Sequence, residues 1–245
     1  MSLSPSELVR YERQMLISGW GVEGQKKLKS AKVAVVGIGG LGCSAAIYLA
    51  AVGIGKIILV DKGKFKLNNL NRQILCWQRD VGKFKAEVAK EKLEALNPGI
   101  EVDAVVAKIT NDNTHDVIGD VDVVLDGQDN WKTRFVINEY CVRHSIPFIH
   151  AGVSALHGQM TTIVPGKGPC LRCVFPKDPP EVEKIPVLGA TPALFASLQV
   201  METVKLVTGI GKPFVGRMLF ANGEEIVFET VEVKRNVECP VCGNL

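Results

Sequence analysis

Short aliphatic runs alternate with longer segments of helical periodicity over the first two thirds of the chain, and this alternation constrains the fold most. Runs of Val, Ile and Leu without polar interruption are typical of strands that helices cover on both faces. The expected strands are residues 32–36, 56–60, 100–107, 121–125 and 148–149, and the expected helices are 41–52, 84–96, 110–118 and 131–144. The sequence therefore predicts an α/β fold with a doubly wound, Rossmann-like and mainly parallel sheet.

The pattern changes after Gly152, where the sequence predicts a small antiparallel section. The segment 166–192 holds six of the twelve prolines and is expected to be a crossover loop. The expected elements around it are a strand at 159–164, a helix from 191 to about 207 that Gly209 ends, and a hairpin of 218–220 with 225–233 around Asn222-Gly223. We expect residues 1–245 to form a single domain that begins with a helical segment at 1–31.

The overall charge does not indicate a particular class of binding partner. The 245 residues include 29 Lys and Arg against 26 Asp and Glu, so the net charge is only +3, and we expect neither a nucleic-acid nor a membrane surface. No stretch reaches the roughly 18–20 apolar residues that a membrane span needs. The first 13 residues contain no apolar signal-peptide core. We therefore expect a cytoplasmic protein.

A glycine-rich turn follows the first strand and opens the first helix. Its glycines are Gly37, Gly39, Gly40 and Gly42. Bare backbone N–H groups and the positive end of the helix would there face a phosphate. Asp61 ends the second strand 19 residues after Gly42, where it could accept a hydrogen bond from a ribose hydroxyl. Tight packing of strand and helix also selects glycine, and up to this point NAD and ATP fit equally well.

Basic residues on the same rim favour a triphosphate. The rim contains Lys62, Lys64 and Lys66, then Asn68, Asn69, Asn71 and Arg72, and finally Lys85. With MgATP, Arg72 would clamp phosphate oxygens in a fork and Lys85 would act as a point charge. The three lysines are more simply interpreted as a solvated basic loop.

Asp129 and Asn130 follow the fourth expected strand. The first and fourth strands of a doubly wound sheet flank the point where its order reverses, and ligands bind at their carboxyl ends. Asp129 is therefore expected to face the phosphates, with Mg²⁺ between them to offset the repulsion. The alternative role for this pair is to cap the helix that starts at Trp131.

Four of the seven cysteines form two CxxC pairs, Cys170 with Cys173 and Cys239 with Cys242. Two such pairs are typical of a tetrahedral, structural zinc site that is closed to water. A redox role is the alternative. The remaining three, Cys43, Cys76 and Cys141, lie in or beside apolar segments and are expected to be inert buried thiols.

Taken in order, these motifs resemble the MoeB/ThiF/HesA family of adenylyltransferases, relatives of the ubiquitin-activating enzymes. The resemblance runs from residues 10–14 (RYERQ), similar to the family's N-terminal arginine motif, through 82–85 (GKFK) to Cys242. It implies a homodimer that uses MgATP to adenylate the C-terminal glycine of a small ubiquitin-like sulfur carrier ending in Gly-Gly, for molybdopterin or thiamine biosynthesis. Residues 32–152 would bind the nucleotide, and residues 153–245 would bind the carrier and zinc.

The resemblance also implies roles for single residues. Contacts to ATP or its metal are implied for Gly40, Asp61, Asn69, Arg72, Lys85, Asp129 and Asn130, with Asn68 and Asn71 in the same motif. Arg13 would reach the nucleotide of the other subunit. Arg13, Arg72, Lys85 and Asp129 are then the expected catalytic residues.

The chemistry agrees with these roles. A terminal carboxylate has a pKa of about 3.5, so at pH 7 it is already an anion and needs no general base to attack the α-phosphate. The obstacle is the repulsion between this carboxylate and the phosphates of ATP. It amounts to roughly 4 kcal/mol for unit charges about 4 Å apart at an effective dielectric constant of 20. Because no base is needed, the four histidines, His115, His144, His150 and His157, are expected to be structural.

One departure from related enzymes concerns the crossover segment. Members that bond covalently to their carrier keep a cysteine there, and residues 175–190 contain none. We therefore expect the reaction to stop at the acyl-adenylate and a separate persulfide donor to supply sulfur. The alternatives are a zinc-containing NAD(P) oxidoreductase, a non-catalytic scaffold, and a family member that adenylates a peptide or a tRNA.

Overall fold

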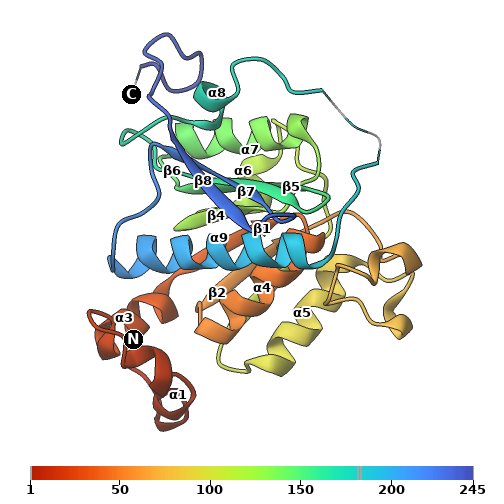
Figure 1. Cartoon of the computed structure of the whole chain (residues 1–245). Coiled ribbons are helices and arrows are strands. Elements are labelled where there is room, and N and C mark those ends of the chain that lie inside the picture. The colour runs from red at the N-terminus through yellow and green to blue at the C-terminus, as the bar shows by residue number, and fades with distance from the viewer. Residues whose placement is uncertain (1, 181, 183, 245) are drawn as a thin grey trace.

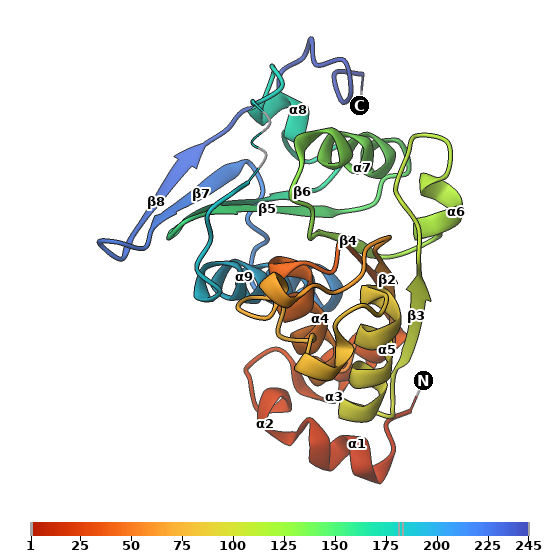
Figure 2. The ribbon, with the colours of Figure 1, turned by 90° about the vertical axis from the view of Figure 1, so that its right-hand side faces the viewer.

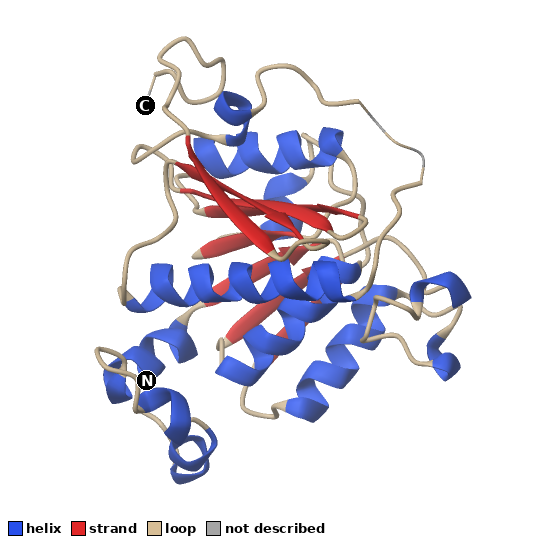
Figure 3. Ribbon diagram, in the orientation of Figure 1, coloured by secondary structure: helices blue, strands red, loops and turns tan. Residues whose placement is uncertain are grey.

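The computed structural model describes residues 2–180, 182 and 184–244, which form one eight-stranded sheet with helices on both faces (Figures 1 and 3). The strand order is β3-β2-β1-β4-β5-β6-β7-β8, and the first five of these are parallel. The parallel strands are β1 (Lys32–Val36), β2 (Lys56–Val60), β3 (Glu101–Val105), β4 (Val123–Asp126) and β5 (Phe148–Ser154). The antiparallel strands are β6 (His157–Ile163), β7 (Arg217–Asn222) and β8 (Val227–Glu232).

The helices form two layers, which Figure 2 shows on opposite sides of the sheet. One layer contains α4 (Gly40–Val52), α5 (Lys85–Leu96) and α9 (Ala190–Thr208), and the other contains α6 (Thr114–Ile118), α7 (Trp131–Arg143) and α8 (Leu171–Val174). The N-terminal helices α1 (Pro5–Arg10), α2 (Glu12–Met15) and α3 (Gly21–Ser30) lie below α4 in Figure 1. Two short 3₁₀ helices, η1 (Leu67–Asn69) and η2 (Gln78–Asp80), follow β2.

Alternation along β1 explains why both faces are covered. Val33 and Val35 belong to the apolar cluster under α4 and α9, whereas Ala34 and Val36 belong to the cluster under α6 and α7. All four side chains are completely buried. A strand that is apolar at successive positions must bury both of its faces, so the uninterrupted aliphatic runs required two helical layers.

The structure confirms the predicted fold class and the expected elements, with differences at their ends. β5 continues to Ser154 because it pairs along its whole length with β6. Helix α6 starts at Thr114, since the side chain of Asn113 accepts a hydrogen bond from the N–H of Thr110 and closes a turn there. The hairpin has a four-residue loop, residues 223–226, because Asn222 pairs with Val227. Within its described residues, the predicted crossover loop contains the short helix α8, and α9 begins at Ala190 near its end.

Among the described residues, none of the helices combines the length and the hydrophobicity that crossing a bilayer would require.

The turn between β1 and α4 depends on two glycines. Gly37 has a φ of +100°, which favours glycine, and its N–H donates to the carbonyl of Val60 over 2.8 Å. A Cβ on Gly42 would lie 1.8 Å from the carbonyl oxygen of Gly37. A side chain at Gly42 would therefore push helix α4 away from the strand that precedes it.

We expect Gly42→Ala to lower the free energy of unfolding by about 3 kcal/mol, because the new methyl group overlaps rigid backbone. Gly39→Ala is the matched control in the same turn, since a Cβ there meets only the Gly127 carbonyl, at 3.7 Å. Its effect should not exceed about 1 kcal/mol. Urea denaturation of both variants measures the difference, and equal effects would contradict this account of the turn.

Candidate active site

The predicted nucleotide residues meet at the carboxyl ends of β1, β2 and β4. Asp61 connects two of the loops there, since its Oδ2 accepts from the N–H of Ile38 over 2.8 Å and its Oδ1 from that of Gly63 over 2.6 Å. Each carboxylate oxygen keeps a further acceptor position, so a hydrogen bond from a ribose hydroxyl remains chemically possible. Asp61 thus fixes the glycine turn, a role that the sequence did not indicate.

Lys85 lies on the other side of the same loop. It begins α5, and its N–H donates to the carbonyl of Gly63 over 3.0 Å. A Cβ on Gly63 would lie 3.0 Å from Oδ1 of Asp61 and 3.6 Å from Cε of Lys85. The carboxylate and the lysine side chain therefore flank Gly63, and the structure brings them together as predicted.

Arg72 lies beside the glycine turn, with its Cγ 3.5 Å from the position that a Cβ on Gly40 would occupy. Its Nη1 donates to the carbonyl of Asn68 and to Oδ1 of Asn71, both over 2.9 Å. Buried Asn69 shapes the loop, because it accepts from the N–H of Lys66 and donates to Oδ1 of Asn68. The asparagines therefore hold the segment that carries Arg72.

Asp129 and Asn130 have different surroundings. Oδ1 of Asn130 accepts from the N–H of Thr133 over 2.9 Å and caps α7, which is the alternative role weighed from the sequence. The Asp129 side chain is exposed at the end of the loop that follows β4. Its carboxylate is thus open to solvent on the same edge of the sheet as the glycine turn.

Arg13 is not part of this group within its own chain. It is exposed on α2, and its neighbour Gln14 donates to the carbonyl of Val52, at the far end of α4 from the glycine turn. A helix of 13 residues is about 20 Å long, so Arg13 lies roughly one helix length from the turn. The structure does not bring Arg13 together with Arg72 and Lys85.

The four cysteines of the two CxxC pairs come together, as predicted. Their sulfur atoms all lie within 4.8 Å of one another, with Cys170 and Cys239 3.7 Å apart and Cys173 and Cys242 3.4 Å apart. Tetrahedral zinc with bonds of about 2.3 Å would need sulfurs roughly 3.8 Å apart, so the cluster fits such an ion. The cysteine cluster places the C-terminal tail beside α8.

The other three cysteines are buried, which agrees with their expected role as inert thiols. Burial raises the pKa of Cys43 to about 12 and raises the pKa of Cys141 even further. Burial also raises the pKa of Cys76. Because the thiolate is the reactive form, raised pKa values suppress nucleophilic chemistry at these positions.

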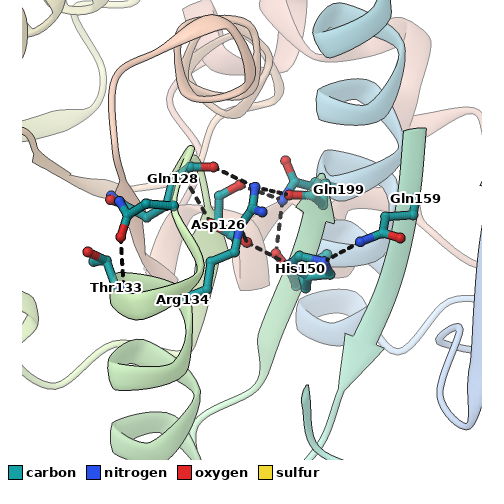
Figure 4. Close-up of polar contacts among 10 residues, drawn as sticks. Asp126, Gln128, Thr133, Arg134, His150, Gln159 and Gln199 are labelled. Carbon is teal, nitrogen blue, oxygen red and sulfur yellow. Dashed lines mark hydrogen bonds and ion pairs between the residues drawn. The ribbon is translucent and has the colours of Figure 1, made fainter. Parts of the chain in front are cut away.

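A buried polar network next to the site was missed by the sequence reasoning (Figure 4). The completely buried Asp126 ends β4, and its Oδ2 accepts from Nε of Arg134 over 3.0 Å and from Nδ1 of His150 over 2.7 Å. Arg134 also donates through Nη2 to the carbonyls of Gln128 (2.6 Å) and Ala151 (3.1 Å). An acidic residue that ends an aliphatic strand, with an arginine in the first turn of the next helix, was the available signal.

His150 is held neutral in this network. Burial lowers the pKa of His150, and the nearby charge of Arg134 lowers it further, while Asp126 acts in the opposite direction. A carboxylate can only accept, so Nδ1 of His150 carries the proton. Nε2 is then a bare acceptor, and Gln159 lies 3.5 Å from it. His150 has the structural role that the sequence suggested.

A cavity of about 570 Å³ opens beside the network. Its inner end is lined by Arg134, Gly152 and Gln159, and its outer end by Glu229 of β8 and by Glu225 in the loop before that strand. Residues of the crossover segment form one wall. The cavity thus leads from the outer edge of the sheet toward the loop that carries Asp129.

Comparison with known proteins assigns the family. The model of the ThiF family matches residues 11–241. The protein HesA of Leptolyngbya boryana is 41% identical over 245 residues, which covers 100% of this chain and 88% of the relative. The SAMP-activating enzyme E1 of Haloferax volcanii is 41% identical over 248 residues (99% and 92%). The sulfur carrier protein adenylyltransferase of Thermus thermophilus is 39% identical over 254 residues (100% and 94%).

Solved structures agree with this assignment. A crystal structure of E. coli MccB with ATP has a TM-score of 0.87 and 30% identity, and the match covers 96% of this chain and 75% of that one. The motifs quoted from the sequence therefore lie on a fold that similar enzymes share. The chain belongs to the ThiF family, and it is an enzyme of the adenylyltransferase class.

Proposed function

We propose that the protein uses MgATP to adenylate the C-terminal glycine carboxylate of a small ubiquitin-like sulfur carrier that ends in Gly-Gly. The observation that carries this proposal is the convergence of the glycine turn, Arg72, Lys85 and Asp129 at one edge of the sheet, beside a cavity that opens to the surface. Among the similar proteins, one is named a sulfur carrier protein adenylyltransferase and another a SAMP-activating enzyme E1. The products are the acyl-adenylate and pyrophosphate.

The reaction requires one anion to approach another. A carboxylate oxygen of the carrier forms a bond to the α-phosphorus, and the bond from that phosphorus to the leaving pyrophosphate breaks. Backbone N–H groups of the turn and the positive end of α4 hold phosphate oxygens, while Arg72 and Lys85 supply positive charge. Mg²⁺ suits exposed Asp129, because this ion takes one or two carboxylates together with phosphate oxygens and water. When bound, it neutralises phosphate charge.

A homodimer would complete the site. Arg13 lies roughly one helix length from the glycine turn of its own chain, so it can serve a nucleotide only if that nucleotide belongs to a second copy. We propose that Arg13 reaches across a dimer interface in this way. An arginine supplied by a partner adds positive charge at the phosphates only in the assembled enzyme.

The sulfur step is assigned to another protein. The segment 175–190 contains no cysteine that could form a thioester with the carrier. We propose that the adenylated carrier receives sulfur from a separate persulfide donor, in molybdopterin or thiamine biosynthesis. Cytoplasmic location follows from that role.

A second candidate substrate is a free peptide. The structural similarity to MccB favours it, because one of those structures is a complex of this microcin C7 biosynthetic enzyme with N-formylated MccA. The oxidoreductase alternative has less support, since Arg72 and Lys85 add positive charge that a pyrophosphate held by a glycine turn does not need.

The activity predicts carrier-dependent exchange of labelled pyrophosphate into ATP. Arg72→Ala, Lys85→Ala and Asp129→Asn should each lower the exchange rate about 100-fold or more, because each removes charge stabilisation of the transition state. Lys62→Ala is the matched control in the same basic loop and should stay within about twofold. Exchange at the wild-type rate in the three variants, or no exchange with any Gly-Gly carrier or peptide, would refute the proposal.

We propose that the four-cysteine cluster holds one structural zinc ion. Metal analysis should give one zinc per chain, and Cys173→Ser should lose that ion and lower the melting temperature by about 10 °C. Cys43→Ala is the control, since it alters the core but should keep the zinc. A chain with full zinc content after the Cys173→Ser change would contradict this assignment.

A further inference from the structure

The inner end of the cavity presents a donor and an acceptor with spare hydrogen-bonding capacity. Arg134 is only 6% exposed, and its Nε and Nη2 are bonded within the network. Among the described residues its Nη1 has no hydrogen-bond partner, although it carries two N–H groups. Arg134 lines the cavity, so its Nη1 is available to donate to an acceptor oxygen of a molecule bound there.

The acceptor is Oε1 of Gln159, and the network determines which way this amide points. Nε2 of His150 can only accept, so Gln159 must present its amide nitrogen to His150. The amide oxygen then points away from His150 (Figure 4), and Gln159 is one of the residues that line the cavity. Asp126 and His150 are therefore positioning residues for Gln159.

The side chains of Arg134 and Gln159 both lie beside Gly152, which lines the same cavity. A Cβ on Gly152 would lie 3.4 Å from Nε2 of Gln159 and 3.6 Å from Nη1 of Arg134. Because Gly152 has no side chain, another chain can approach the sheet between the two groups. A glycine of the incoming chain would fit this space best.

The shape of the cavity favours an extended chain. Gly152 pairs with Gln159, Gln159 with Phe220, and Phe220 with Glu229, so these residues form one row across four strands. With strands about 4.8 Å apart the row is roughly 14 Å long, and an extended chain of about four residues covers that distance. The row leads from the outer strand to the space above Gly152.

We propose that Arg134 and Gln159 together hold one peptide unit of the substrate's C-terminal segment above Gly152. This inference rests on the proposed function. Nη1 of Arg134 donates to the carbonyl of that unit, and Oε1 of Gln159 accepts its N–H. A terminal carboxylate is a poorer fit, because it has no proton to offer to Oε1 of Gln159 and would be repelled by it.

The guanidinium of Arg134 also contacts the loop after β4 that carries Asp129. Nη2 of Arg134 donates to the carbonyl of Gln128, and Oδ1 of Asp126 accepts from the N–H of Gln128 over 2.9 Å. Gln128 directly precedes Asp129, so Arg134 holds the backbone next to the residue proposed to bind the metal. The substrate's end is thereby positioned toward the phosphates.

N-methylation of single peptide bonds tests the contact to Gln159. The probes are acetylated decapeptides ending in Ala-Ala-Gly-Gly, each with one of the last four peptide nitrogens methylated, used with the full-length protein. Peptide affinity is measured by calorimetry and pyrophosphate exchange is followed in parallel. In the wild type, methylation at one of these positions should weaken binding about 3- to 10-fold more than at the others.

Gln159→Met should weaken binding of the unmethylated peptide by a similar factor and abolish the extra effect at that position, with the affinity for ATP unchanged. His157→Gln, two residues away on the same face of β6, is the matched control and should keep the wild-type methylation pattern. Gly152→Ala should weaken peptide binding at least tenfold without loss of folding, since the new Cβ makes only ordinary contacts.

Two different failures are distinguishable. An unchanged methylation pattern in Gln159→Met, with exchange intact, would overturn the peptide contact alone. Absence of exchange and of peptide binding in the wild type, with no exchange by any carrier, would overturn the proposed function and this inference with it.

Discussion

The buried ion pair of Asp126 and Arg134 is the interaction on which the geometry of the site depends. Both side chains are at least nine-tenths buried, and taking two charges out of water is costly unless hydrogen bonds satisfy what remains of each group. Here the carboxylate of Asp126 also accepts hydrogen bonds from the backbone N–H of Gln128 and from Nδ1 of His150. The guanidinium of Arg134 also donates to two backbone carbonyls. Breaking such a pair leaves an uncompensated buried charge, so the loop after β4 has one strongly preferred conformation.

The arrangement of charge around that loop follows from the chemistry. The buried pair is neutral overall, so it orders the loop without adding net charge. The groups that do add charge come from two loops, which carry Arg72 and Asp129, and from the first turn of α5, which carries Lys85. This separation lets rigid packing set the geometry, while the groups that face the phosphates stay accessible to a ligand.

Much of this was predictable from the sequence because it follows from local rules. Aliphatic runs predicted the strands, the glycine spacing predicted the turn, and the CxxC pairs predicted the cysteine cluster. The Asp126 network was not predictable in this way, because Arg134 and His150 become its partners only when α7 and β5 pack against β4. The length of β5 was missed for the same reason, since pairing with β6 decides it.

The position of the network also bears on why a glycine-ended chain suits this site. At Gly152 the side chains of Arg134 and Gln159 both lie within 3.6 Å of the position that a Cβ would occupy. A chain bound there as proposed would offer its backbone to both polar groups. In the proposed contact, one peptide bond supplies an acceptor for Arg134 and a donor for Gln159, so both side chains of the network are satisfied by backbone alone.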